Sequence, residues 1–159
     1  MFTLIKEIGN LLITKKWTIA TAESCTGGLI SGAFTEMAGS SNFFKGAIVA
    51  YDNSVKMSLL NVKEQTLNKF GAVSSQTVEE MTQGVCELLA TDCALSVSGI
   101  AGPGGGTLDK PIGLVYIGLK IKDEVGSFRH QFEGNRSQVR DYTVKCALLH
   151  LKNGLKNYE

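Results

Sequence analysis

The stretch from Thr21 to Gly28, TAESCTGG, sets a carboxylate, hydroxyls and a thiol side by side. It follows the short run 17–22, whose Thr and Ile content predicts a strand, and it leads into 27–37, which predicts a helix. The polar cluster is therefore placed at the carboxyl end of a strand and the amino end of a helix. In open α/β sheets ligands bind at such positions, so the stretch is either a polar turn or part of an active site.

Around this stretch the sequence predicts alternating helices and strands. Apolar residues recur at helical spacing near the start of the chain and again before residue 90, whereas short runs rich in β-branched residues lie between them. The late strands are expected to form an antiparallel hairpin that turns at 122–124. This order predicts an α/β fold, a three-layer α/β/α sandwich on a mixed β-sheet. The predicted helices are 2–15, 27–37, 52–60, 75–90 and 137–155, and the predicted strands are 17–22, 46–51, 93–97, 112–121 and 125–134.

Length and charge limit the classes of function. With 159 residues and 43% hydrophobic content, the chain is expected to form one domain over 1–159. Sixteen Lys and Arg nearly balance fifteen Asp and Glu without a run of like charge, which argues against nucleic acid or an anionic membrane as the partner and favours a small molecule. No signal peptide is recognisable, and the four cysteines lack CxxC spacing, so a cytoplasmic protein with reduced thiols is expected.

Two glycine-containing segments are candidates for ligand binding. Ser24, Thr26, Gly27 and Gly28 at a predicted helix start are suited to an anion such as phosphate, although an ordinary helix cap by Ser or Thr explains the same pattern. The segment 98–106, SGIAGPGGG, is either a flexible surface loop or a place where backbone approaches a ligand closely. Neither segment matches a Walker A or GxGxxG pattern. The candidate glycines of the second segment are Gly99, Gly102 and Gly104.

No metal site or cofactor is predicted from the residues. The two histidines, His130 and His150, are far apart in sequence and lie outside any HExxH or HxE context. Hydroxyl chemistry without histidine remains, and Ser40 or Ser41 could form a candidate cluster with Tyr51 and Lys56. Lys56 could act as its base only if burial or a neighbouring positive charge lowers its pKa, and lysines near tyrosines are usually just solvated.

Several motifs, in this order and over nearly the whole chain, closely resemble the C-terminal domain of the competence- and damage-inducible protein CinA. The motifs are TAESCTGG, AGSSNFFKGAIVAY, NSVK, GAVS, SGIAGPGGGTLDKPIGLVYIG and EGNR. Stand-alone members of this family act as nicotinamide mononucleotide (NMN) deamidases. The resemblance implies hydrolysis of NMN to nicotinate mononucleotide and ammonia without a metal, and it implies a homodimer.

The resemblance also carries roles onto residues of this chain. Ser41 would attack the carboxamide carbon, Lys56 would take and return protons, and Tyr51 would relay or orient. Substrate contacts fall on Ser24 and Thr26 of the first loop. Arg136, or Arg140 one helical turn later, would pair with the substrate phosphate.

Two other hypotheses remain open. Cys25, at the predicted helix start, is an alternative nucleophile, because a thiol at a helix amino end can have a lowered pKa; it is otherwise a small buried core thiol. A nucleotide-binding regulatory module without turnover would use the same glycine loops. If Lys56 is not the base, Glu23 is the first alternative.

Overall fold

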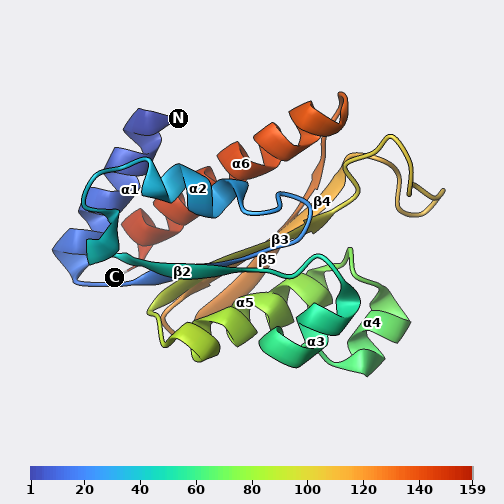
Figure 1. Ribbon diagram of the computed structural model, residues 1–159, viewed down its shortest axis with the longest axis horizontal. Coiled ribbons are helices and arrows are strands. Elements are labelled where there is room, and N and C mark those ends of the chain that lie inside the picture. The colour runs from blue at the N-terminus through green and yellow to red at the C-terminus, as the bar shows by residue number, and fades with distance from the viewer. Residues whose placement is uncertain (159) are drawn as a thin grey trace.

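A five-stranded mixed sheet forms the centre of the computed structural model, which describes residues 1–158 (Figure 1). The spatial order is β2-β1-β3-β4-β5. The strand β1 is parallel to both of its neighbours, whereas β3 with β4 and β4 with β5 are antiparallel pairs, so the predicted mixed sheet is confirmed. The strands are β1 (Ile19–Glu23), β2 (Phe44–Val49), β3 (Cys93–Gly99), β4 (Leu114–Ile121) and β5 (Glu124–Gln131).

Helices cover both faces of this sheet, as Figure 1 shows, which confirms the three-layer α/β/α sandwich. One layer holds α1 (Phe2–Lys15), α2 (Leu29–Thr35) and the long α6 (Arg136–Asn157). The other layer holds α3 (Asn53–Leu60), α4 (Glu64–Phe70) and α5 (Ser75–Leu89). A short 3-10 turn, η1 (Ser40–Asn42), joins α2 to β2.

The predicted elements agree with the observed ones to within about three residues at each end, but α4 was not predicted. Its sequence, EQTLNKF, has too few apolar positions to show a helical stripe. A tertiary contact holds it instead: the carboxylate of Glu80 on α5 accepts hydrogen bonds from the Lys63 N–H and the Thr66 hydroxyl, at 2.8 and 2.6 Å. Because Glu80 belongs to another helix, the local sequence of α4 does not predict this contact.

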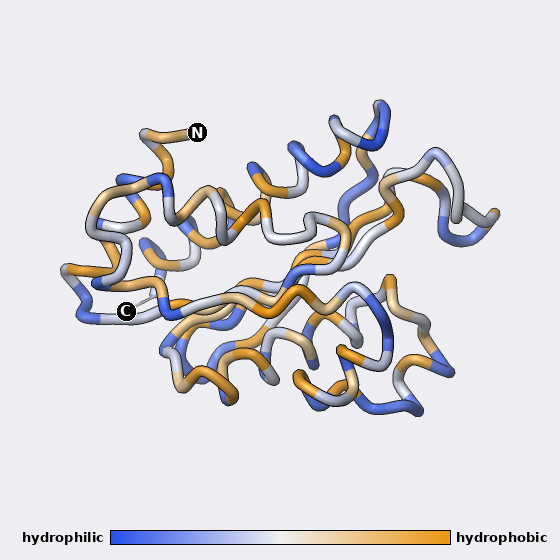
Figure 2. Tube along the Cα trace, viewed as in Figure 1, coloured by the Kyte–Doolittle hydropathy of each residue, from blue (hydrophilic) through white to orange (hydrophobic). Residues whose placement is uncertain are grey.

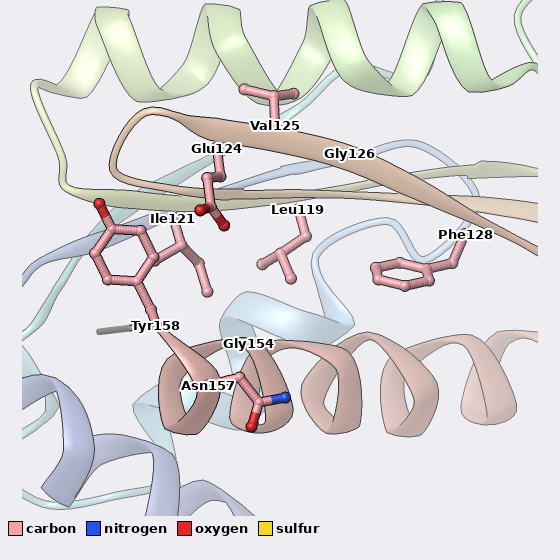
Figure 3. Close-up of a pocket in the computed structure, with 9 residues that line it drawn as sticks. All are labelled: Leu119, Ile121, Glu124, Val125, Gly126, Phe128, Gly154, Asn157 and Tyr158. Atoms are coloured by element: carbon pink, nitrogen blue, oxygen red, sulfur yellow. The ribbon is translucent and has the colours of Figure 1, made fainter.

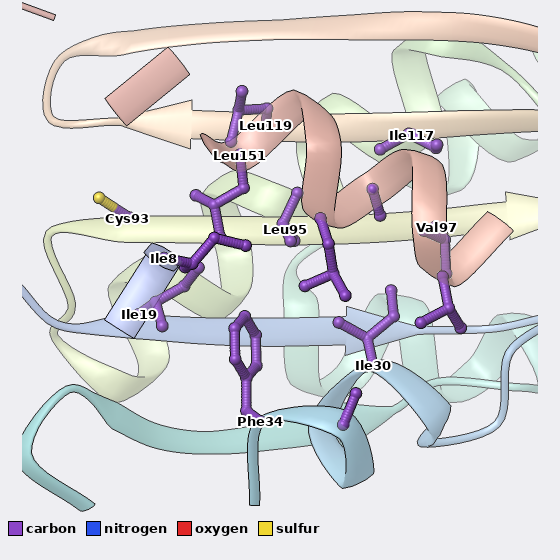
Figure 4. Close-up of a cluster of buried hydrophobic side chains, with 14 of the residues drawn as sticks. Ile8, Ile19, Ile30, Phe34, Cys93, Leu95, Val97, Ile117, Leu119 and Leu151 are labelled. Carbon is purple, nitrogen blue, oxygen red and sulfur yellow. The ribbon is translucent and has the colours of Figure 1, made fainter. Parts of the chain in front are cut away.

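Apolar side chains pack on both faces of the sheet. On the face of α1, α2 and α6, large residues such as Ile8, Phe34 and Leu151 pack against Ile19 and Leu95 (Figure 4). On the opposite face the strands present mostly alanines, which lets α5 lie close to the sheet. Figure 2 shows the same segregation along the chain, with apolar stretches on the strands and polar ones at the outer loops. Within residues 1–158, no helix is both long and apolar enough to cross a bilayer.

Gly84 of α5 allows α3 to approach this helix closely. A Cβ atom at Gly84 would lie 1.9 Å from the carbonyl oxygen of Leu60, the last residue of α3. The Leu60 backbone cannot move aside as the end of a flexible side chain can, so only glycine fits at this contact. The contact fixes the end of α3, the helix that carries Lys56.

We predict that Gly84→Ala lowers the free energy of unfolding by about 1–3 kcal/mol or more, because the new methyl group overlaps the α3 backbone. Gly32→Ala in α2 is the matched control, since nothing lies within 4 Å of a Cβ there. The control is expected to keep or raise stability by up to about 1 kcal/mol, because alanine favours helix. Urea unfolding of both variants measures the difference, and equal stability of the two would refute the close-packing account.

Candidate functional site

A pocket of about 200 Å³ lies at the carboxyl ends of the parallel strands. Glu23 pairs with Val97 in the sheet, so the residues that follow them, Ser24 and Ser98, emerge side by side. Both serines line the pocket and are nearly buried. The complete lining is Ser24, Cys25, Tyr51, Asn53, Lys56, Ala72, Val73, Ser98, Gly99, Ala101 and Arg136.

Lys56 is the buried lysine of this pocket, and only 1% of it is exposed. It lies on α3, which begins directly after β2 and is capped by the Asp52 side chain, an acceptor for the Ser54 N–H at 2.9 Å. The Lys56 Nζ donates hydrogen bonds to the carbonyl oxygens of Ala50, at 2.8 Å, and Tyr51, at 3.2 Å. It also lies 3.3 Å from the Ser24 Oγ.

The burial of this amine favours its neutral form. Burial lowers the pKa of Lys56 below its ordinary value, while the nearby Asp52 and Cys25 oppose that shift. A neutral amine has two hydrogens and one lone pair. The charged amine donates its three hydrogens to the two carbonyl oxygens and the Ser24 Oγ, whereas in the neutral amine the two carbonyl oxygens accept both hydrogens and the lone pair faces the Ser24 hydroxyl. In its neutral form the amine is placed to take a proton from Ser24.

Cys25 follows Ser24 in the pocket, but its thiol is poorly suited to attack. Only 6% of Cys25 is exposed, and burial raises its pKa to about 12. Because the thiolate is the nucleophilic form, a thiol with this pKa stays almost wholly protonated near pH 7. The site therefore favours Ser24 over Cys25.

The carboxylate of Glu23 occupies the amino end of α2. It is fully buried and accepts four hydrogen bonds, from the backbone N–H groups of Ile30 and Ser31 at 2.8 and 2.9 Å and from the hydroxyls of Thr26 and Thr21 at 2.7 and 3.2 Å. An internal anion thus satisfies the helix start where we expected a phosphate. The predicted phosphate cradle at Thr26, Gly27 and Gly28 is wrong in this respect. These residues build the turn instead, with φ angles of 58° and 105° at the two glycines.

Arg140 also has a structural partner. From α6, its Nε donates to the carbonyl oxygen of Cys25 at 3.0 Å and its Nη2 to that of Thr26 at 3.2 Å. The guanidinium therefore clamps the loop that follows Ser24, and Arg140 does not line the pocket. The proposed pairing of Arg140 with a substrate phosphate does not fit this geometry.

Arg136 and Tyr51 meet at the mouth of the pocket. The Arg136 Nη1 donates to the carbonyl oxygen of Gly102 at 2.9 Å, and its Nη2 lies 3.3 Å from the Tyr51 hydroxyl. Tyr51 is 63% exposed, and its phenol contacts Arg136 rather than Lys56 or Ser24. Both side chains are placed to contact a bound molecule, but the phenol is not a proton relay between Ser24 and Lys56.

Ser41 lies at the other end of the sheet. It belongs to the exposed η1 turn before β2, whereas Lys56 follows the carboxyl end of the same strand (Figure 1). The six-residue strand between them spans about 20 Å. Within one chain the expected cluster of Ser41, Tyr51 and Lys56 therefore does not form, and the serine beside Lys56 is Ser24. Spacing along the sequence misled here because the intervening residues form a strand.

The glycine-rich loop after β3 only partly meets the expectation. Gly99 lines the pocket, and a Cβ there would overlap Val115 on β4. Gly102 contributes its carbonyl oxygen to Arg136, and Gly104 is exposed outside the pocket. Five further lining residues lie within the segment or motifs quoted from the sequence but were not named as site residues: Asn53, Ala72, Val73, Ser98 and Ala101. Ser98 had a usable signal, because it follows a predicted strand in the same way as Ser24.

A second pocket, of about 270 Å³, lies between the β4–β5 hairpin and the end of α6 (Figure 3). Its walls are mostly apolar, with Ile121 beside Tyr158 at one end, Leu119 in the middle and Phe128 at the other end. Glu124 and Tyr158 are its titratable residues, and it holds no serine, cysteine or lysine. This second pocket therefore lacks the hydroxyl and amine pair that Ser24 and Lys56 provide in the first.

Comparison with known proteins gives a consistent result. The model of the CinA C-terminal domain family matches residues 1–155. A CinA-like protein from Endomicrobium trichonymphae is 53% identical over 146 residues, covering 92% of this chain and 34% of that protein. A CinA-like protein from Dictyoglomus turgidum is 49% identical over 155 residues, covering 98% of this chain and 38% of that protein. The chain thus spans little more than a third of these relatives.

Solved structures resemble the fold closely. The competence damage-inducible protein A of Klebsiella pneumoniae superposes with a TM-score of 0.96 at 33% identity, covering 99% of this chain and 98% of that one. A competence/damage-inducible protein of Agrobacterium tumefaciens superposes with a TM-score of 0.89 at 40% identity, covering 97% and 96%.

We predict that Glu23→Gln lowers the free energy of unfolding by about 1–3 kcal/mol or more, because an amide nitrogen would face N–H donors of α2 that now bind a carboxylate. Glu36→Gln, the same change at the exposed end of α2, is the control and is expected to change stability by less than about 0.5 kcal/mol. Chemical unfolding of both variants provides the measurement. A Glu23→Gln variant as stable as the control would contradict the structural role of the buried carboxylate.

Proposed function

Because this chain belongs to the CinA C-terminal domain family, we propose that it hydrolyses the carboxamide of NMN to give nicotinate mononucleotide and ammonia, with Ser24 as nucleophile and Lys56 as general base. The observation that supports this proposal most is the buried Lys56 amine 3.3 Å from the Ser24 hydroxyl, inside a pocket. The names of the relatives speak only of competence and damage induction, so the reaction rests on this geometry and on the resemblance of the motifs.

The proposed reaction has two stages, formation of an ester on Ser24 and its hydrolysis, and Lys56 transfers a proton twice in each stage. Lys56 accepts the Ser24 proton as the oxygen attacks the carboxamide carbon, and it then protonates the departing nitrogen, so that the C–N bond breaks and ammonia leaves. Water attacks the resulting ester and gives its proton to Lys56, which returns it to Ser24 as the ester C–O bond breaks. Backbone N–H groups beside Ser24 are the proposed donors to the oxyanion.

The mouth of the pocket suggests where the nucleotide part would lie. Arg136 is the guanidinium that lines the pocket, and its contacts to Gly102 and Tyr51 leave donor hydrogens available. We propose that it binds the phosphate of NMN, while the exposed ring of Tyr51 lies alongside the substrate. Arg140 is left with its structural role in holding the loop.

A nucleotide-binding module without turnover is the second candidate. Its pocket would bind NMN with the same residues, and ammonia would not be released. The buried amine beside Ser24 favours the enzyme, because a binding site has no need of a lysine removed from water, which costs free energy.

We predict that Ser24→Ala abolishes ammonia release from NMN, a loss of about a thousandfold or more, because within residues 1–158 Ser24 provides the hydroxyl that contacts the Lys56 amine. Ser41→Ala is the matched control and is expected to keep most of the activity, since Ser41 lies at the other end of β2. Cys25→Ala is expected to keep substantial activity as well. If Ser41→Ala or Cys25→Ala abolishes turnover while Ser24→Ala does not, the assignment of the nucleophile is wrong.

We predict that turnover rises with pH through an apparent pKa well below the ordinary lysine value of about 10.4. Burial lowers the pKa of Lys56, so the neutral amine, which accepts the proton, becomes populated as pH rises through that lowered value. Lys56→Arg is expected to lose nearly all turnover because a guanidinium does not deprotonate at these pH values. Lys45→Arg, at an exposed position of β2, is the control with unchanged activity. A pH–rate profile that Lys56→Arg leaves intact would exclude Lys56 as the base.

A further inference from the structure

The two histidines of the chain meet outside the pocket, although they are twenty residues apart in sequence. His130 lies on β5 and His150 on α6, and their Nε2 atoms are 2.8 Å apart. In this contact one Nε2 donates a hydrogen and the other accepts it. Neither Nδ1 makes a hydrogen bond within residues 1–158, so the donor histidine can move its proton to Nδ1 and free a second lone pair.

Neighbouring aromatic rings hold both imidazoles in place. His150 is stacked on Phe128, with ring centroids 3.7 Å apart and planes 9° apart. His130 is stacked on Phe132, with centroids 5.2 Å apart and planes 5° apart. The pair is half-buried rather than sealed, so one side of it remains open to solvent. The two nitrogens are thus positioned before any ligand arrives.

We propose that His130 and His150 form a two-histidine binding site for a late first-row divalent metal ion such as Zn²⁺ or Ni²⁺. Zinc–imidazole bonds are about 2.0–2.1 Å long, so two imidazole nitrogens on one ion lie about 2.8–3.4 Å apart for bond angles between 90° and 110°. The two Nε2 atoms are 2.8 Å apart, so this distance has to increase by less than about 1 Å for both nitrogens to bind one ion. Neutral imidazole is a preferred ligand of these metals, whereas Mg²⁺ prefers oxygen.

The remaining coordination positions are filled by water. Among residues 1–158, no three His, Cys, Asp or Glu side chains are grouped as a metal site, so the pair supplies two protein ligands. Cys146 lies one helical turn before His150 on α6 and is partly buried, which makes it the residue to exclude experimentally. A bound ion would join the edge strand β5 to α6, the helix that carries Arg136 and Arg140 at its amino end.

Zn²⁺ titration followed by ¹⁵N NMR of the imidazoles tests the site, because the chain contains only two histidines. The protein is used without a histidine tag, at pH 7.5 and with its thiols reduced by a phosphine. We expect the Nε2 signals of both histidines to shift together and to saturate at one ion per chain, while Mg²⁺ leaves them unchanged. Unshifted signals in 1 mM Zn²⁺, or a shift of one histidine alone, would overturn the proposal.

Variants separate this pair from other ligands. His130→Ala and His150→Ala are each expected to weaken Zn²⁺ binding by about tenfold or more in calorimetry, which corresponds to about 1.4 kcal/mol. Cys146→Ser is the control and is expected to bind as the unaltered protein does. Thermal unfolding without metal establishes that each variant is folded, and added Zn²⁺ is expected to raise the midpoint of the unaltered protein and of Cys146→Ser only. Loss of binding in Cys146→Ser, or its retention in both histidine variants, would contradict a two-histidine site.

Discussion

The proposed chemistry depends on the contact between the buried amine of Lys56 and the Ser24 hydroxyl. Removing a lysine from water costs free energy, and that cost falls on its charged form. The carbonyl oxygens of Ala50 and Tyr51 fix the Nζ atom in the pocket, 3.3 Å from the Ser24 hydroxyl. In the proposed mechanism a neutral Lys56 takes the place of the histidine that many serine hydrolases use, and neither His130 nor His150 lines the pocket.

Much of the surrounding structure serves to place these two side chains. The Ala50 N–H donates to the carbonyl oxygen of Glu23, so the strand ends that carry Ser24 and Lys56 are tied together. The Glu23 carboxylate accepts hydrogen bonds from the first residues of α2. Arg140 on α6 donates a hydrogen bond to the Cys25 carbonyl oxygen and so holds the loop between β1 and α2. Below the sheet, Gly84 lets α3 dock closely on α5. Each of these contacts joins segments that are distant in sequence, so the positions of Ser24 and Lys56 depend on the packing of the whole sandwich.

The sequence predicted the fold better than it predicted the site. Helical periodicity and short β-branched runs depend on local sequence, so the sheet and its covering helices could be placed, whereas α4 depends on the distant Glu80 and was missed. Tyr51 and Lys56, which follow a predicted strand, and Arg136, which the resemblance supplied, line one pocket in the structure, whereas their roles stay predictions. Ser41 lies outside this pocket, because the six-residue strand β2 separates it from Tyr51 and Lys56 by about 20 Å. The roles of Glu23 and Arg140 are set by hydrogen bonds that no spacing rule reveals.

Direct titration of the Lys56 amine tests the central claim most closely. With lysines labelled by ¹³C at Cε, the Lys56 signal can be assigned by its loss in Lys56→Met and followed by NMR as pH rises. The account predicts that this signal titrates well below the other lysines, and below the ordinary value of about 10.4, because its charged form is desolvated. Titration of Lys56 together with the exposed lysines would contradict the account, since a lysine charged at working pH cannot take the proton from Ser24.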